Sequence, residues 1–306
     1  MDEYETRETV ELHWVNWTNI DPDDSDADYR SDGEGRRRPH GMIRIGHLSD
    51  FHLGKPLDDA EGPARAEAWM SAMREVDCDV VVISGDLVEK PGNRVGLLRA
   101  RHIFESSDVP WVVVPGNHDV AEPGQTGAFE GLFGSYPRVE HHAGVEFILL
   151  DSLRGLSSDQ RSPFERLDAA RHGSYSNGRV GADQLKYIEG QLRGSYRPRV
   201  LVLHHHLADE QAVTGEDADD GVPKQLMRPL EDADQVLDWA DAHGIGIAFH
   251  GHIHRWWPAY RRRDVVVFNS GSSTRGRPVP RARVVEIQGN GELTAIGTLA
   301  LGEEQT

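Results

Sequence analysis

The sequence predicts an α/β fold made of βαβ units, and three observations support this prediction. Short apolar runs rich in Val, Ile and Leu recur along the chain, and each stops at a polar turn. Between several of these runs, apolar residues recur with helical spacing. The C-terminal part is β-rich, which is compatible with two packed sheets. Near-continuous apolar strands are typical of parallel sheets covered on both faces, so we expect helices to pack on the sheets.

The first half of the chain alternates strands with helices. We expect the first strand at residues 43–48 and a helix at 64–76, where the apolar residues have helical spacing. Residues 80–83 are all Val or Ile and predict a buried parallel strand. A second helix is expected at 93–106, and the apolar residues 111–114 predict a strand that stops at Pro-Gly.

The second half repeats the alternation. Apolar runs predict strands at 145–150, 200–203 and 245–249, and helical spacing predicts helices at 182–192 and 232–243. The expected β segments of the C-terminal part are residues 256–260, 265–268, 283–287 and 293–299. The polar stretches expected to be loops are residues 153–180 and 207–229.

The first forty-one residues differ in composition from the rest of the chain. Residues 1–34 hold 12 acidic residues against two basic ones and show no sustained periodicity. We therefore expect residues 1–41 to be an acidic, disordered N-terminal extension that is dispensable, and residues 42–306 to be a single domain. The alternative is that an apolar set within this segment docks on the domain. That set is Leu12, Trp14, Val15, Trp17 and Ile20.

Composition restricts the class of protein and its partners. The net charge is −18, and an acidic surface argues against a nucleic-acid backbone as the main partner. The single cysteine, Cys78, excludes an internal disulfide and fits a reducing compartment. The sequence shows no apolar run of about 20 residues, the length of a membrane span, and no secretory signal at Met1. We expect a soluble, cytoplasmic protein with no membrane partner.

Polar side chains with metal-ligand chemistry follow the predicted strands. They are Asp50, His52, Asp86, Asn117, His118, Asp119, a histidine from 204–206, His252 and His254. The carboxyl ends of strands are where open α/β sheets bind ligands. A set of oxygen and nitrogen donors without thiolate suits Mn, Fe, Zn or Mg. A carboxylate shared by two such ions would hold them about 3.5–4 Å apart, as in two-metal hydrolytic sites.

The ordered motifs together resemble a known family. They are Asp50-x-His52, Gly85-Asp86, Gly116-Asn117-His118-Asp119, the His204–His206 run and Gly251-His252-x-His254. This set is similar to the calcineurin-like metallophosphoesterase superfamily, over roughly residues 42–288. The resemblance implies a four-layer α/β/β/α sandwich of two mixed β-sheets flanked by helices. It also implies a hydrolase with two divalent metal ions, whose identities stay open.

The resemblance assigns each residue a role. One ion would be held by Asp50, His52, Asp86 and His254, and the other by Asp86, Asn117, His205 and His252. The choice of His205 follows from the family's His-x-Pro pattern with Leu207 in place of Pro, and His204 and His206 remain alternatives. His118 would be the catalytic imidazole that faces the scissile phosphate, and Asp119 would orient it.

The implied reaction is hydrolysis of a small phosphoester. A metal-bridged hydroxide would attack in line, without a covalent enzyme intermediate, while His118 stabilises charge or protonates the leaving oxygen. Among subfamilies, protein phosphatases are disfavoured because Glu89-Lys90 replaces the Asp-Arg of their second motif. The class III cyclic-nucleotide phosphodiesterases are the most similar, through Leu149–Ser152, Gly178–Gly181 and the three histidines after residue 203.

Two other functions are compatible with the same residues. A phosphomonoesterase or nucleotidase would use the same fold and the same two ions. A non-catalytic scaffold would keep the fold after losing its metals, although every expected ligand is present here. The physiological substrate and the oligomeric state stay open.

Overall fold

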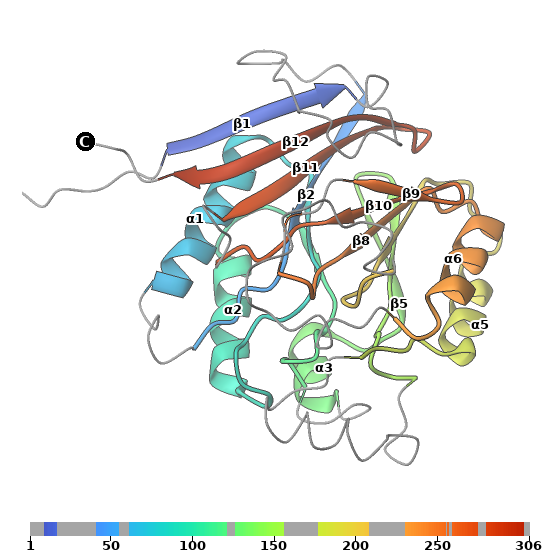
Figure 1. Cartoon of the computed structure of the whole chain (residues 1–306), viewed down its shortest axis with the longest axis horizontal. Coiled ribbons are helices and arrows are strands. Elements are labelled where there is room, and N and C mark those ends of the chain that lie inside the picture. The colour runs from blue at the N-terminus through green and yellow to red at the C-terminus, as the bar shows by residue number, and fades with distance from the viewer. Residues whose placement is uncertain are drawn as a thin grey trace, which may run out of the picture.

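The computed structural model describes residues 9–16, 41–54, 61–120, 126–155, 177–207, 230–254, 256, 259–274 and 280–302. These residues form two six-stranded mixed sheets that share an apolar core, with helices on their outer faces (Figure 1). This architecture confirms the predicted α/β fold of two mixed sheets flanked by helices.

The first sheet joins strands from both ends of the described chain. Its spatial order is β1 (Thr9–Asn16), β12 (Leu293–Gly302), β11 (Arg281–Gln288), β2 (Met42–Leu48), β3 (Val80–Ile83) and β4 (Trp111–Val113). The last three strands are parallel, whereas β1, β12, β11 and β2 pair in antiparallel fashion. The carboxyl ends of β2, β3 and β4 therefore lie at the same edge.

The second sheet has the order β5 (Arg138–His142), β6 (Val145–Leu149), β7 (Arg199–Val202), β8 (Ile247–His250), β10 (Val265–Asn269) and β9 (Tyr260–Arg262). Its four central strands are parallel, and an antiparallel strand closes each side. The two strands that matter for the site are β7 and β8, which are neighbours with their carboxyl ends together.

Helices cover the two outer faces. Figure 1 shows α1 (Glu61–Glu75) and α2 (Arg94–Glu105) on the side of the first sheet, and α5 (Ala182–Gln191) and α6 (Ala233–Ala242) on the opposite side. A shorter helix, α3 (Gly127–Phe133), lies near the lower end of α2 in that view. None of the helices in the described part of the chain is long and apolar enough to cross a membrane.

Strand β6 shows why the second sheet is apolar on both faces. Successive side chains of a strand point to opposite faces. Phe147 and Leu149 join the core between the two sheets, whereas Ile148, and Leu150 directly after the strand, join the core under α5 and α6. All four side chains are fully buried. A strand in this position needs apolar residues at every position, which explains the continuous apolar runs in the sequence.

The structure contains the predicted helices and strands whose residues it describes, with ends shifted by a few residues, except at 256–260, where Trp256 and Ala259 lie outside strands and β9 begins at Tyr260. Two elements are additions. Helix α3 and strand β5 were not expected, because α3 contains two glycines and β5 is mostly polar. Tertiary contacts account for both: Phe129 and Phe133 bury one side of α3, and β5 pairs along β6. The expected loops at 153–180 and 207–229, and residues 257–258, lie largely outside the described residues.

Residues 9–16 differ from the expected disordered extension. They form strand β1, which pairs antiparallel with β12 from Thr9 opposite Gly302 to Asn16 opposite Ala295. The sequence signal was present, because Val10, Leu12 and Trp14 occupy every second position. The acidic composition of the surrounding residues concealed this short alternation. The other residues before Gly41 lie outside the described residues, and their dispensability remains a prediction.

The pairing of β1 predicts a measurable contribution to stability. A chain that starts at residue 17 lacks β1 and leaves one edge of β12 without hydrogen bonds. We expect its melting temperature to fall by several degrees, at about 2–4 °C for each kcal/mol lost in a domain of this size. A chain that starts at Thr9 keeps β1 and serves as the matched control. Equal melting temperatures for the two chains would show that β1 does not stabilise the domain.

Candidate metal centre

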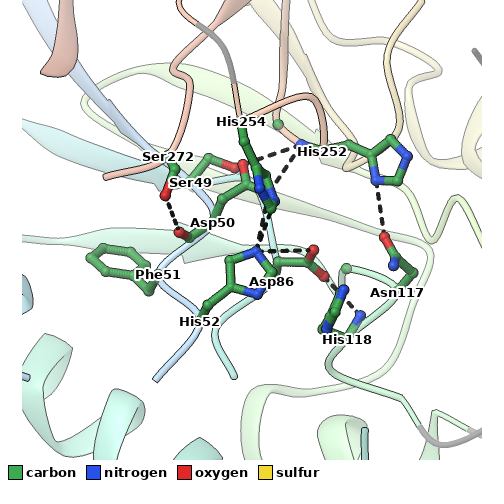
Figure 2. Close-up of polar contacts among 12 residues, drawn as sticks. Ser49, Asp50, Phe51, His52, Asp86, Asn117, His118, His252, His254 and Ser272 are labelled. Carbon is green, nitrogen blue, oxygen red and sulfur yellow. Dashed lines mark hydrogen bonds and ion pairs between the residues drawn. The ribbon is translucent and has the colours of Figure 1, made fainter. Parts of the chain in front are cut away.

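The polar residues predicted at strand ends meet at one place in the structure. Asp50 and His52 follow β2, Asp86 follows β3, and Asn117 follows β4. His252 and His254 follow β8 of the second sheet, and their side chains point toward those from the first sheet (Figure 2). The candidate centre therefore lies where the carboxyl ends of strands from both sheets come together.

The backbone of these segments adopts an uncommon conformation. Five of the candidate residues have left-handed φ angles: Asp50 (54°), His52 (48°), Asp86 (54°), His252 (76°) and His254 (51°). For residues other than glycine this conformation is uncommon and costs of order 1 kcal/mol each. Such strain persists only where the surroundings fix the backbone, and it is concentrated at functional sites.

Hydrogen bonds between the strand-end loops provide that fixation. The amide of Asp50 donates to the carbonyl of Gly85 at 3.0 Å, and the amide of His52 donates to the carbonyl of Asp86 at 3.0 Å. The hydroxyl of Ser272 donates to the Asp50 carbonyl at 2.8 Å. The loops after β2 and β3 therefore continue the pairing of their strands beyond the sheet.

A glycine makes room for the central carboxylate. A Cβ atom on Gly116 would lie 2.2 Å from Oδ1 of Asp86 and 2.3 Å from its backbone nitrogen. Both distances are far below van der Waals contact, so no larger residue fits here. The Gly-Asn-His-Asp turn after β4 thus begins with glycine because the Asp86 carboxylate packs directly on its backbone.

The first group of candidate ligands consists of Asp50, His52, Asp86 and His254. One ligand atom from each lies within 4.8 Å of the others. Nε2 of His254 lies 3.2 Å from Oδ1 of Asp50, and Nε2 of His52 lies 3.6 Å from Oδ2 of Asp86. The two imidazole Nε2 atoms face each other at 2.8 Å. The structure brings together the four residues expected to hold one ion.

The second group consists of Asp86, His204 and His252, whose ligand atoms also lie within 4.8 Å of one another. Oδ1 of Asn117 lies 3.0 Å from Nε2 of His204 and 3.0 Å from Nδ1 of His252. Oδ2 of Asp86 lies 3.4 Å from Nε2 of His204. Asp86 therefore belongs to both groups.

The geometry favours His204 over His205, the histidine expected from the sequence, as the neighbour of Asn117 and Asp86. Nδ1 of His204 contacts the Ser84 carbonyl at 2.7 Å, which turns Nε2 toward Asn117 and Asp86. The ring of His205 also packs on that of His252, with centroids 4.4 Å apart, but its Nδ1 contacts Oγ of Ser152 at 2.7 Å. Three consecutive histidines made the register ambiguous, and the point where β7 ends decides which one faces the group.

The expected partnership of Asp119 with His118 is also corrected. The Asp119 carboxylate accepts hydrogen bonds from the amides of Leu87 (2.7 Å), Val88 (3.1 Å) and Gly116 (2.9 Å). Nδ1 of His118 instead lies 2.7 Å from the carbonyl oxygen of Glu89. Asp119 thus joins the loops after β3 and β4, whereas a backbone carbonyl orients His118.

Burial and neighbouring charge set the protonation of the cluster. Burial lowers the pKa of His52 to about 4 and that of His252 to about 3, so both rings are neutral at pH 7. Burial alone would raise the pKa of Asp50, but His254 and His204 lower it to about 2. Burial lowers the pKa of His204, but the neighbouring Asp86 carboxylate raises it to about 9.

These donors fit a pair of divalent cations. The described ligand atoms are carboxylate oxygens, imidazole nitrogens and a carboxamide oxygen, which suit Mn, Fe, Zn or Mg. The two buried carboxylates lie near His52 and His252, whose imidazoles are neutral, and neutral imidazole is the form that binds metal. Nε2 of His204 lies 3.4 Å from Oδ2 of Asp86, and an imidazole in this position must give up any proton on that nitrogen to become a ligand.

The sequence matches the model of a known family. The sequence model of the family described as "Calcineurin-like phosphoesterase" matches residues 43–256 of the chain. This interval contains all the residues of both candidate groups.

Three curated relatives are 24–28% identical to this chain over the aligned residues. A "probable cyclic nucleotide phosphodiesterase" from Psychrobacter arcticus is 25% identical over 184 residues, which are 55% of this chain and 61% of that protein. A protein of the same printed name from Fibrobacter succinogenes is 28% identical over 167 residues, covering 54% and 57%. Another from Synechococcus is 24% identical over 218 residues, covering 70% and 74%. The chain thus spans only 61% and 57% of the length of the first two relatives.

Two solved structures support the fold. A dimetal phosphatase from Danio rerio superposes with a TM-score of 0.57 at 14% identity, covering 86% of this chain and 99% of that protein. The TT1561 protein of Thermus thermophilus gives a TM-score of 0.51 at 14% identity, covering 83% and 98%. At this identity the likeness concerns the arrangement of sheets and helices.

The geometry predicts different effects for two neighbouring histidines. We expect His204→Ala to weaken binding of one divalent ion by at least about 100-fold, because it removes a group beside Asn117 and Asp86. His205→Ala is the matched control and should change the affinity by less than about 10-fold. Titration of the metal-depleted protein with Mn measures both constants. The reverse order of effects would restore the assignment of His205.

Proposed function

The chain belongs to the calcineurin-like phosphoesterase family, and on this premise we propose that it is a two-metal phosphodiesterase that hydrolyses a small phosphodiester such as a cyclic nucleotide. The observation that carries the proposal is the position of Asp86. Its carboxylate is a member of both groups of candidate ligands, as a bridging ligand between two ions must be.

The proposal divides the ligands between two ions. Asp50, His52, Asp86 and His254 would hold one, and Asp86, Asn117, His204 and His252 would hold the other. Divalent ions bound there would supply Lewis acidity toward phosphoryl oxygens and lower the pKa of water to near neutrality. The amide of His118 donates to Oδ1 of Asp86 at 2.8 Å, and this bond helps to keep the shared carboxylate in place.

His118 has a different role in this proposal. Its Nδ1 lies 2.7 Å from a backbone carbonyl, which can only accept a hydrogen bond, so Nδ1 carries a proton. The ring is partly exposed, like that of His254 and unlike the buried rings of His52, His204 and His252. With Nδ1 fixed in this way, Nε2 of His118 is the atom that would give a proton to the leaving oxygen or stabilise its charge.

Three considerations favour a small phosphodiester as the substrate. The three curated relatives described above are all named probable cyclic nucleotide phosphodiesterases. The chain carries a net charge of −18, which disfavours binding of a long polyanion. A phosphodiester also carries one negative charge fewer than a phosphomonoester dianion, so it is the easier of the two to bring to an acidic protein.

A panel of phosphomonoesters and phosphodiesters assayed with added Mn tests the function. We expect hydrolysis of cyclic nucleotides or other small diesters, at rates well above those for the matching monoesters. A preference for monoesters would identify a phosphatase or nucleotidase instead. Bound metal without hydrolysis of any ester would contradict an enzymatic function.

The shared carboxylate should be essential. We expect Asp86→Asn to lower phosphodiesterase activity by more than about 100-fold. Loss of a residue that only hydrogen-bonds to a metal ligand already costs about 10–100-fold, and Asp86 would be a ligand itself. Asp241→Asn, an equivalent change at an exposed position of α6, should leave activity unaltered. Full activity of Asp86→Asn would exclude this carboxylate as a bridging ligand.

His118 should affect turnover rather than metal content. His118→Ala should retain both ions and lower kcat by about 10²–10⁴-fold, the usual contribution of a positioned acid. The loss should be smaller with an activated aryl leaving group, which needs no proton. His102→Ala, an exposed histidine on α2, is the control. Loss of bound metal in His118→Ala would identify His118 as a ligand and not as the acid.

A further inference from the structure

Glu89 lies three residues after Asp86 and is fixed by pairing between two strand-end loops. Its amide donates to the carbonyl of Leu53 at 3.0 Å, and the amide of Leu53 donates to the carbonyl of Leu87 at 2.9 Å. Leu53 and Val88 form an isolated parallel bridge between the same loops. The backbone at Glu89 therefore has a defined position relative to the loop that carries Asp50 and His52.

The side chain of Glu89 contacts the outer nitrogen of His52. Its Oε2 lies 3.2 Å from Nδ1 of His52, while Nε2 on the other side of the ring faces His254 and Asp86. The Glu89 side chain is 22% exposed and that of His52 is 1% exposed. A carboxylate beside Nδ1 favours the tautomer with the proton on Nδ1, and this tautomer leaves the Nε2 lone pair free for a metal ion.

The main chain of Glu89 acts on a second imidazole. Its carbonyl oxygen accepts a hydrogen bond from Nδ1 of His118 at 2.7 Å. The rings of His52 and His118 are in edge contact, with centroids 4.7 Å apart. Atoms of His52, Glu89 and His118 lie within 4.8 Å of one another. One residue thus contacts the Nδ1 side of two imidazoles that have different roles in the proposed reaction.

We propose that Glu89 is a positioning residue for both imidazoles, orienting His52 through its carboxylate and His118 through its carbonyl oxygen. The inference rests on the proposed two-metal function, because it gives His52 the role of a ligand. The contact with His52 and the contact with His118 can be tested separately, because one is made by the side chain of Glu89 and the other by its main chain. A side-chain substitution removes the contact with His52, whereas the carbonyl oxygen that accepts from His118 remains in every variant.

Two substitutions with one control test this. Glu89→Ala removes the carboxylate, and Glu89→Gln keeps an oxygen acceptor of the same reach without its charge. Glu67→Ala is the control, since Glu67 is an exposed carboxylate on α1. The full chain is depleted of metal and titrated with Mn, and the tautomer of His52 is read from long-range proton–nitrogen NMR spectra at pH 7.

We expect Glu89→Ala to weaken Mn affinity by about 10–100-fold and to populate the other tautomer of His52. Glu89→Gln should recover at least half of this loss on a logarithmic scale, and Glu67→Ala should match the wild type in both measurements. The NMR signals of His118 should stay in the Nδ1-protonated form in all variants. A general loss of stability would not produce this pattern, because it would not change the tautomer of His52 while leaving that of His118 unaltered.

Three results would overturn the inference. Wild-type Mn affinity and tautomer in Glu89→Ala would show that the carboxylate positions nothing. A third ion bound by the wild type and lost in Glu89→Ala would make Glu89 a ligand. A wild-type protein that binds no Mn at all would overturn the proposed function and this inference together, whereas the first two results leave the two-metal function intact.

Discussion

The burial of two carboxylates at one point is the constraint on which the rest of this structure depends. Asp50 and Asp86 are almost fully removed from solvent, and two negative charges so placed need compensation. The protein supplies part of it through amides: His252 donates to Oδ2 of Asp50 at 3.1 Å, and His118 donates to Oδ1 of Asp86 at 2.8 Å. Imidazoles supply another part: burial lowers the pKa of His204, but the neighbouring Asp86 carboxylate raises it to about 9. A pair of cations would provide the remaining positive charge, so the same constraint explains both the ligand set and the proposed chemistry.

The sheets and the strained loops act together to meet this constraint. Parallel strands bring several carboxyl ends to one edge, but a side chain reaches the centre only if the backbone turns sharply after the strand. Left-handed φ angles at Asp50, Asp86 and His252 provide these turns. Their cost is offset by pairing that continues beyond the strands, as between Asp50 and Gly85, and by the rigid apolar core beneath. Asp119 adds to this rigidity by tying the loops after β3 and β4 through three amides.

Much of the fold and of the candidate centre could be predicted from sequence, because continuous apolar strands that end in polar turns are a strong local signal. Asp86 and Asn117 follow such strands directly, and the structure places them close together. The register of the three consecutive histidines could not be predicted, since all three are buried and only the hydrogen bond from His204 to Ser84 selects one. The partner of His118 was missed for a related reason: a backbone carbonyl leaves no trace in a sequence. Strand β1 was missed because acidic residues surround its short alternation and because its pairing partner lies at the far end of the described chain.

The pairing of β1 with β12 has a consequence for the order in which the protein is assembled. Thr9 lies opposite Gly302, so these two strands are separated by nearly the whole sequence. During synthesis, β1 leaves the ribosome early and has no edge to join until β12 has been made, whereas β2, β3 and β4 can pair as soon as each emerges. Closing so long a loop is entropically costly and slow, and an unpaired strand is open to association with other chains meanwhile. Acidic residues flank β1, so the β1 segments of different chains repel one another during that interval.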